Sequence, residues 1–224
     1  MQYLYVFGFG RKRIIDSGAR VMTRISMITV LLCLVAALSQ PALVADQSCE
    51  NCLGGGLDAP IKIEVFSDFQ CPACRSLYMD TMKQVLRDYS SSDKVCVIYH
   101  EFPLAIHAHS REAARYALAA RKLGRQQWLS VLDSLYSDQP LWAQNGMVQV
   151  SVARALSPSD FQALLKLLQD PSINQTIDRD IALGQERQVK STPTMFVTSL
   201  GREQKVEQVL PYPVLKSFFD KVVK

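Results

Sequence analysis

Residues 61–74 have the sequence IKIEVFSDFQCPAC. The first six are mostly β-branched or aromatic and predict a buried strand that ends near Ser67. A helix is expected from Cys74 onward, because apolar residues recur there at helical spacing: Leu77, Met82, Val85, Leu86 and Tyr89. The two cysteines Cys71 and Cys74 are therefore predicted to lie at a strand-to-helix junction.

This junction places Cys71 in a setting that favours redox chemistry. The unpaired N–H groups and the positive dipole end of a helix N-terminus stabilise a thiolate. Such settings lower a cysteine pKa to about 3.5–7.5. Pro72 suits the first helical position, and Cys74, one turn further on, is placed to attack a mixed disulfide. A bare C-x-x-C also fits half a zinc site or a structural disulfide, whereas a strand–CPxC–helix favours a redox dithiol.

A second motif is Ser191-Thr192-Pro193-Thr194, which directly precedes a short strand at 195–197. A proline in this position, preceded by the β-branched Thr192, indicates a turn and is compatible with a cis peptide bond. An ordinary trans turn proline is the alternative.

Together the two motifs resemble the thioredoxin superfamily, specifically the DsbA-like thiol–disulfide oxidoreductases. The resemblance covers about residues 61–223. It includes a strand at 95–99 that leads into Glu101-Phe102-Pro103-Leu104, then the stretch from His107 to Ser110 and an alanine-rich helix at 113–120. These are similar to the entry into the helical insertion of that family.

The resemblance implies an α/β thioredoxin fold with an inserted helical domain and two cysteines that cycle between dithiol and disulfide. It implies that Pro193 is cis and that Thr192 offers its backbone to the substrate, beside Pro72 and Ala73. Glu64 matches the family's buried acid and is implied to relay protons. Its apolar neighbours predict a raised pKa; a charge on an edge strand facing solvent is the alternative.

Ala73 departs from the best-known oxidising members, which carry histidine between the cysteines. Loss of that imidazolium implies a less stabilised thiolate and a weaker oxidant. The pair Pro72-Ala73 also differs from the Gly-Pro of reducing thioredoxins. The direction of the redox reaction therefore stays open.

The net charge of +4 arises from 25 basic and 21 acidic residues and belongs to the N-terminal segment. Residues 46–224 hold 20 of each, so nothing indicates nucleic-acid binding. Residues 1–45 are predicted to be a signal peptide, because an apolar run at 25–44 follows basic residues and precedes small ones. The alternative is an uncleaved membrane anchor. Either directs the protein to the periplasm or another extracytoplasmic compartment, where disulfides persist.

Residues 46–59 are predicted to be a Gly-rich linker. They contain a second C-x-x-C, Cys49 and Cys52, without the strand and helix that would activate a thiol. A local disulfide and an auxiliary redox pair fit equally well, ahead of a metal site. Cys96, within the strand at 95–99, is interpreted as a buried small apolar residue.

The domain proper is predicted over residues 60–224, with the helical insertion at about 107–188. Helices are expected at 111–123, 126–136, 146–156, 159–169 and 171–188, with Ser159 capping the fourth. After Pro193, strands are expected at 194–199 and 205–209, then a helix at 213–223. The three histidines lack an accompanying ligand set, so no metal is expected, and the implied dithiol chemistry needs no cofactor.

The leading hypothesis is an exported enzyme that forms or exchanges disulfides in cysteine-containing client proteins. Cys71 attacks or is attacked, Cys74 resolves, and a membrane-bound or soluble redox partner recycles the dithiol. A reductase or isomerase that uses the same residues is the alternative within enzymes. From another class, a binding module whose dithiol grips Cu(I) is disfavoured, because no methionines cluster near Cys71.

Overall fold

The computed structural model describes residues 52–89, 91–92 and 94–223, which belong to one compact unit, Ser48–Lys224. The predicted signal peptide or anchor at 1–45, and Cys49, lie outside the described residues. Within the described ranges no helix combines the length and the hydropathy that crossing a membrane requires.

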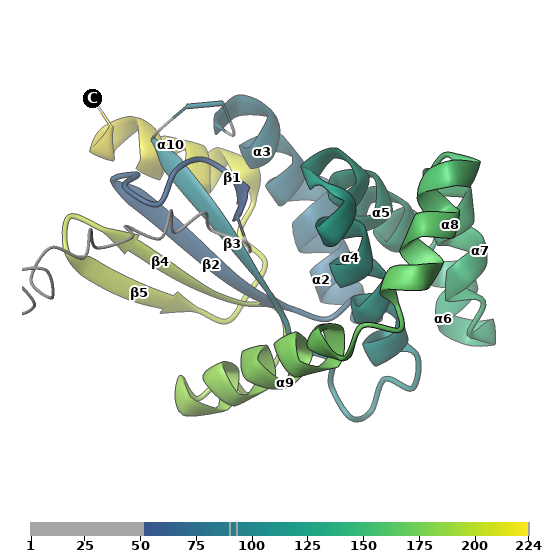
Figure 1. Ribbon diagram of the computed structural model, residues 1–224. Helices are drawn as coiled ribbons and strands as arrows, with labels where there is room; N and C mark the ends of the chain where they lie inside the picture. The colour runs from purple at the N-terminus through teal and green to yellow at the C-terminus, as the bar shows by residue number, and fades with distance from the viewer. Residues whose placement is uncertain (1–51, 90, 93, 224) are drawn as a thin grey trace, which may run out of the picture. The chain divides into compact units, whose positions relative to one another are not determined.

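A five-stranded sheet forms the centre of the domain, in the order β1-β3-β2-β4-β5 (Figure 1). The neighbours β2 and β3 are parallel, and the other pairs are antiparallel. The strands are β1 (Cys52–Gly54), β2 (Ile61–Ser67), β3 (Val95–Glu101), β4 (Thr194–Ser199) and β5 (Arg202–Val206). The β2 strand ends where the sequence pattern predicted, whereas β5 starts three residues before its predicted position.

The first strand, β1, occupies part of the segment that was predicted to be a linker. Cys52 pairs with Ile98 and Gly54 with Val97 of β3, so the polypeptide is already in the sheet at residue 52. Gly55 follows with φ +79°, and a Cβ at this position would come within 1.9 Å of the Val95 carbonyl oxygen. Only glycine allows the two backbones to approach this closely.

The helix after β2 begins at Pro72, earlier than the apolar spacing predicted, and it is not uniform. It consists of α2 (Pro72–Leu77), a π-helical turn η1 (Tyr78–Met82) and α3 (Lys83–Tyr89). Periodicity cannot detect the π turn, because one wide turn changes the angular position of only a few residues.

Alternation along β2 assigns its side chains to two different layers. Ile61, Ile63 and Val65 belong to the main core beneath α2, α3 and α10 (Tyr212–Val222). Phe66 belongs to a smaller cluster on the other face, covered by α9. Figure 1 shows the sheet between these layers, with α3 and α10 on one side and α9 on the other.

The insertion between β3 and β4 is helical, as predicted, and its helices are α4 (Ser110–Leu123), α5 (Arg125–Ser137), α6 (Gln139–Asn145), α7 (Val148–Ala155), α8 (Pro158–Leu167) and α9 (Pro171–Glu186). The prediction missed α6, because its Pro140 reads as a break although proline is favourable in a first helical turn. It also misassigned the cap of α8. Ser157, not Ser159, accepts the hydrogen bond from the Asp160 N–H.

Candidate active site

The loop between β2 and α2 sets Cys71 at the N-cap of α2, in extended conformation, with Pro72 in the first turn. The Cys71 N–H donates to the Asp68 carbonyl oxygen at 3.1 Å. Cys71 is 8% exposed and its neighbours Pro72 and Ala73 are exposed. The predicted placement at a helix N-terminus is confirmed, and the neighbouring surface is open to a substrate.

The surroundings of Cys71 favour its thiolate. A hydrogen bond from the Cys74 thiol, assisted by the Thr192 side chain and the backbone N–H groups of Cys74 and Ala73, outweighs burial and lowers the pKa of Cys71 to about 5. The two backbone donors, from Cys74 and Ala73, are among the free N–H groups that a helix N-terminus provides. At neutral pH Cys71 is therefore a thiolate.

Cys74 lies in the opposite environment. Only 1% of it is exposed, and burial together with the neighbouring Cys71 sulfur raises its pKa well above the ordinary value. The Ser67 hydroxyl and the Asp68 N–H, whose distance to the Cys74 Sγ is 3.4 Å, oppose that shift only partly. The dithiol thus contains one ionised sulfur, which is ready to act as a nucleophile, and one protonated sulfur, which must lose its proton before it can attack.

The second predicted motif packs against the first. The peptide bond between Thr192 and Pro193 is cis, as the resemblance implied. In the thiol form Cys71 donates to the Thr192 carbonyl oxygen at 3.3 Å. Thr192 is itself 8% exposed, and Pro193 is buried. The structure therefore brings together five of the predicted site residues: Cys71, Cys74, Thr192, Pro193 and the Pro72 that starts the helix.

Three hydroxyl groups form a buried chain beside Cys74. The Ser67 hydroxyl lies 2.8 Å from the Tyr136 hydroxyl, which in turn contacts the Tyr99 hydroxyl. Burial raises the pKa of both tyrosines well above the ordinary value, so both stay protonated. Glu101 follows in β3 with 1% exposure, and neither carboxyl oxygen has a hydrogen-bond partner among the described residues. Burial raises its pKa as well.

Asp68, which sequence reasoning passed over, holds the active-site loop together. Its carboxylate accepts from the backbone N–H groups of Gln70 and Leu104, at 2.7 Å each, and from the Ser110 hydroxyl. The Nδ1 atom of His107 lies 2.8 Å from the same group. The side chain is fully buried. The aspartate directly after a buried strand was the available signal, since such a charge needs several partners.

The helical insertion is bonded directly to the dithiol loop. The Gln139 amide donates to the Phe69 and Cys71 carbonyl oxygens at 2.6 and 2.9 Å. Gln70 donates to the Ala143 carbonyl oxygen, and Arg75 to that of Tyr136. Gln139 of the insertion thus satisfies two carbonyl groups of the dithiol loop, and Gln70 and Arg75 in turn satisfy two carbonyl groups of the insertion.

Glu64 lies on the face of the sheet opposite the dithiol, and its pKa is lowered there. The predicted raised pKa is therefore wrong. Its carboxylate is 2.6 Å from Arg187 and 3.3 Å from His100, which also contacts Asp180 at 3.0 Å. The hydrogen bond from His100, followed by the charge of Arg187, lowers the pKa of Glu64 despite partial burial. Glu64 shares its face with Phe66 rather than with the dithiol, because alternation along β2 sends them together. Its predicted role as a proton relay has no supporting contact.

The other two cysteines that the structure describes, Cys52 and Cys96, form a separate group at the β1–β3 edge. Cys52 is disulfide-bonded, whereas Cys71, Cys74 and Cys96 are free. Cys96 is buried, as predicted, but its Sγ lies only 3.2 Å from the Cys52 Sγ. Sequence reasoning missed this contact because β1 was predicted to be part of a linker.

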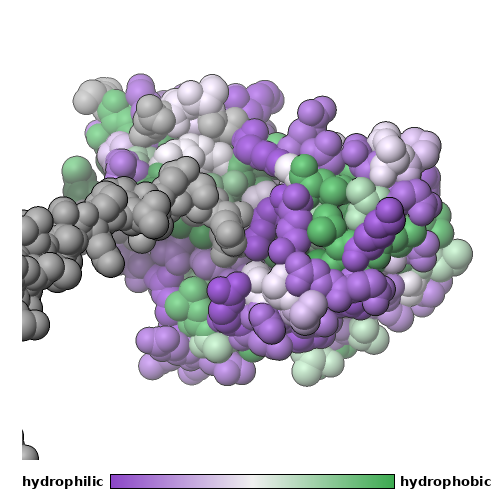
Figure 2. Space-filling model, viewed as in Figure 1, coloured by the Kyte–Doolittle hydropathy of each residue, from purple (hydrophilic) through white to green (hydrophobic). Residues whose placement is uncertain are grey.

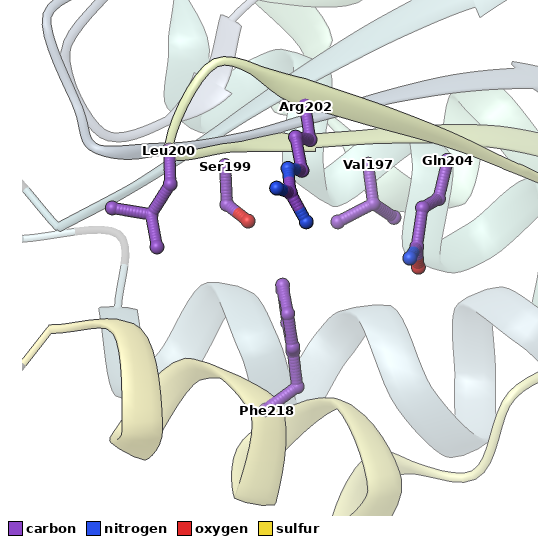
Figure 3. A pocket seen from close by; sticks show the side chains of 6 residues that line it. All are labelled: Val197, Ser199, Leu200, Arg202, Gln204 and Phe218. Atoms are coloured by element: carbon purple, nitrogen blue, oxygen red, sulfur yellow. The ribbon is translucent and has the colours of Figure 1, made fainter.

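Two other features lie away from the dithiol. In the part of the chain that the structure describes, no three His, Cys, Asp or Glu side chains group as metal ligands. A cavity of about 460 Å³ opens between the β4–β5 pair and α10, where Phe218 faces the strands (Figure 3). It lies at the Ser199 end of β4, whereas Pro193 precedes the other end, and it is lined by Val197, Ser199, Leu200, Arg202, Gln204 and Phe218.

Sequence comparisons identify relatives with disulfide chemistry. A family model described as thioredoxin matches residues 46–211. The probable disulfide bond formation protein D of Bacillus cereus is 26% identical over 144 residues, which make up 62% of this chain and 66% of that protein, slightly under two thirds. The disulfide bond formation protein D of Bacillus subtilis is 21% identical over 174 residues, covering 75% of this chain and 74% of the relative.

Solved structures share the fold. BdbD from Bacillus subtilis has a TM-score of 0.61 at 20% identity and covers 76% of this chain and 91% of its own. The thiol–disulfide exchange protein α-DsbA2 from Wolbachia pipientis has a TM-score of 0.62 at 19% identity and covers 92% and 99%. The family model spans well over half of the sequence, and the dithiol, the proline loop and the helical insertion occupy the places that the resemblance implied. The chain therefore belongs to the thioredoxin family.

Proposed function

We propose that this protein donates disulfides to cysteine-containing client proteins outside the cytoplasm. The observation that carries the proposal is the lowered pKa of Cys71, about 5, at the N-terminus of α2. A stabilised thiolate favours the reduced enzyme, which makes the corresponding disulfide a better oxidant. A reductase uses the same residues for the reverse reaction. Stabilisation of the Cys71 thiolate favours the direction in which the enzyme is reduced and the client is oxidised.

The proposed reaction starts from the Cys71–Cys74 disulfide. A client thiolate attacks the Cys71 Sγ, a mixed disulfide forms, and Cys74 leaves as a thiolate. A second client thiolate then attacks the client sulfur of the mixed disulfide, and Cys71 leaves as a stabilised thiolate. The client loses two electrons and the enzyme gains them. A membrane-bound or soluble partner then has to reoxidise the dithiol.

The leaving Cys74 needs a proton, because its pKa in the buried site is well above the ordinary value. The Ser67 hydroxyl, bonded to Tyr136 and through it to Tyr99, adjoins this sulfur and can donate a hydrogen bond to it. The resemblance implied that Glu64 relays protons to the dithiol. We assign that role to this hydroxyl chain instead, because it adjoins the leaving Cys74 sulfur. Glu101, whose pKa is raised by burial, lies at the end of the same strand as Tyr99.

Client binding is proposed at the surface around Cys71. The exposed Pro72 and Ala73 and the loop at Thr192-Pro193 border the sulfur. The helix α6 is hydrogen-bonded to the dithiol loop through Gln139, and its Leu141 is an apolar side chain that is 59% exposed. Figure 2 shows hydrophobic residues gathered over the helical insertion among hydrophilic ones. Such a surface suits an unfolded client segment, whose apolar side chains are still accessible.

The N-terminal segment at 1–45 supports export, either as a signal peptide or as an anchor. Fractionation of the native host would locate the enzyme. Retention of the mature protein in the cytoplasmic fraction would contradict the proposed site of action.

A trapping experiment tests the chemistry. We expect Cys74→Ser to accumulate mixed disulfides with client proteins, because its Cys71 thiolate attacks client disulfides while the Cys74 thiol that would release the client is missing. The matched Cys71→Ser variant lacks the nucleophile and should trap none. Equal trapping by both variants, or by neither, would contradict the assigned roles.

The direction is tested by equilibrating the wild-type dithiol with glutathione buffers. We expect a potential above the value of about −270 mV for thioredoxin and below the value of about −120 mV for DsbA. A potential as low as that of thioredoxin would leave the dithiol chemistry intact but assign the protein to the reductases.

A further inference from the structure

The β1–β3 edge contains a sulfur contact that the dithiol reaction does not use. The Cys96 Sγ lies 3.2 Å from the Cys52 Sγ, and Cys52 is already part of a disulfide. Cys96 is a free thiol with 0% exposure. A free thiol in contact with a disulfide sulfur is the starting arrangement of thiol–disulfide exchange, because the reaction is an attack of one on the other.

The backbone holds these two sulfurs together. Cys52 pairs with Ile98, so Cys96, two residues earlier in β3, is its diagonal neighbour on the same face of the sheet. Diagonal neighbours in antiparallel strands are within reach of each other. The close approach at Gly55 holds β1 against β3, and the bond from the Arg125 Nε to the Leu53 carbonyl oxygen, 2.7 Å, anchors β1 to α5. An S–S bond of about 2.05 Å requires the sulfurs to move only about 1 Å closer.

We propose that Cys52 and Cys96 form a second thiol–disulfide exchange site, in which the disulfide of Cys52 migrates to Cys96 and becomes a bridge between β1 and β3. The Cys96 thiol loses its proton and attacks the Cys52 Sγ. A bond forms between these two sulfurs while the bond from Cys52 to its present partner breaks. The departing sulfur leaves as a thiolate and takes up a proton, so no external oxidant or reductant is consumed.

The surroundings of Cys96 make this exchange slow rather than impossible. Burial, with a smaller contribution from the charge of Glu64, raises the pKa of the Cys96 thiol, and Lys62 beside it opposes the shift. Lys62 is also its partner in the β2–β3 register. Cys96 is therefore mostly protonated, unlike the ionised Cys71, and the small fraction of Cys96 thiolate makes the exchange slow.

The test is a disulfide map of the full chain. The wild-type protein is incubated at about pH 8, quenched with acid, alkylated and digested with trypsin. We expect a population in which the peptide that ends at Lys62 is linked to the peptide that begins at Val95, and fragmentation of the linked pair should place the bond at Cys52 and not at Cys49. Cys96→Ala is the matched control and must lose this link. A wild-type map in which Cys96 is always alkylated would overturn the proposal.

A second variant keeps the result independent of exchange rates. Cys49 is the cysteine nearest to Cys52 in the sequence, and Cys33 is the other one outside the described residues. In the double variant Cys33→Ser, Cys49→Ser, oxidised glutathione should close Cys52 and Cys96 into one disulfide. The rate of Cys71 alkylation, which should stay within about two-fold of wild type, reports that the domain is folded. Two free thiols at Cys52 and Cys96 in that folded variant would also overturn the proposal.

Discussion

Two cysteine sites lie at opposite ends of the same sheet, and they differ in what surrounds their sulfur atoms. The dithiol follows the C-terminal end of β2, where Cys71 caps α2. Cys96 lies near the start of β3, beside Cys52 of β1, on the opposite face of the sheet. The pKa of Cys71 is lowered to about 5, while that of Cys96 is raised.

The difference teaches which local structure activates a thiol. The N–H groups of Cys96 and its neighbours are directed along the sheet plane to other strands, so none is available to the sulfur. At Cys71 the largest contribution is the hydrogen bond from the Cys74 thiol, and the N–H groups of Cys74 and Ala73, which have no carbonyl partner within the helix, add to it. Burial is similar at both sites, so hydrogen-bond supply rather than solvent exclusion separates them.

The largest expected effect is on the stability of the reduced enzyme. The folded pKa of Cys71, about 5, lies below the value of about 8.5 in an unfolded chain. Its ionisation therefore contributes stability that is fully present above about pH 8.5 and is lost as the pH falls towards 5. We expect a change of about 3–5 kcal/mol across this window. Chemical denaturation of wild type and Cys71→Ser at several pH values measures it, and parallel curves would contradict the assignment.

The next effect is the rate of alkylation. At about pH 7 Cys71 is nearly all thiolate, whereas a thiol with a pKa above about 8.5 is at most about 3% ionised. A thiolate of low pKa is intrinsically less nucleophilic, which offsets part of this difference, but Cys96 is also fully buried. Cys71 should therefore react on the order of tenfold or more faster than Cys96. Mass spectrometry of the reduced protein after timed iodoacetamide pulses gives both rates from one sample. Comparable rates in the folded protein would remove the distinction between the two sites.

Ala73→His tests whether the pKa of Cys71, the activated thiol, can be lowered further. A histidine here adds a positive charge and a donor beside the Cys71 sulfur, so the pKa of Cys71 should fall further. We expect the disulfide to become more oxidising by on the order of 30 mV, which is a tenfold change in the equilibrium constant. Equilibration with glutathione buffer measures the change, and Ala73→Gln, of similar length without the charge, is the control. An unchanged potential in both variants would show that position 73 does not act on the sulfur.

Glu64→Gln tests whether this acid belongs to the dithiol or to the Cys96 side. Removal of its negative charge should lower the pKa of Cys96 and speed the alkylation of that thiol a few-fold. Lys62→Gln should have the opposite effect, which makes it the matched control. Peptide oxidation through Cys71 should stay within about two-fold in both. A loss of oxidation in Glu64→Gln alone would restore its predicted catalytic role.

The smallest effect is expected for the double variant Cys49→Ser, Cys52→Ser. Because Cys52 lies on a strand rather than at a helix N-terminus, the pair lacks the activation that the dithiol has. We expect the rate of peptide oxidation to change less than about two-fold. A near-complete loss of activity in a folded variant would instead make this pair a relay that supplies the dithiol.

Sequence reasoning located the dithiol and the proline loop because their signals are local. A β-branched run, a proline and a helical period suffice to place Cys71 at a helix start, and Thr192 with Pro193 adds the second motif. The helical insertion was found for the same reason. Its missed helix α6 starts with Gln139 and Pro140, where the proline was read as an end rather than a beginning.

The rest of the site depends on contacts between distant segments, which a single sequence does not encode locally. Asp68 gathers groups up to 42 residues away, and Gln139 bonds to carbonyls 68 and 70 residues away. The predicted pKa of Glu64 was wrong because it was argued from apolar neighbours in sequence, whereas His100 and Arg187, 36 and 123 residues away, contact the carboxylate. The contact of Cys52 with Cys96 required a three-residue strand that is too short to show any alternation.

The bonds from Gln139, Gln70 and Arg75 have a mechanical consequence for the two halves of the domain. They fasten the helical insertion to the loop that holds Cys71, with donors from both partners. A rigid-body rotation of the insertion must therefore either break the hydrogen bond from Gln139 to the Cys71 carbonyl oxygen or move Cys71 with it. We therefore expect the helical insertion and the Cys71 sulfur to move together, and the insertion does not open and close over a fixed sulfur.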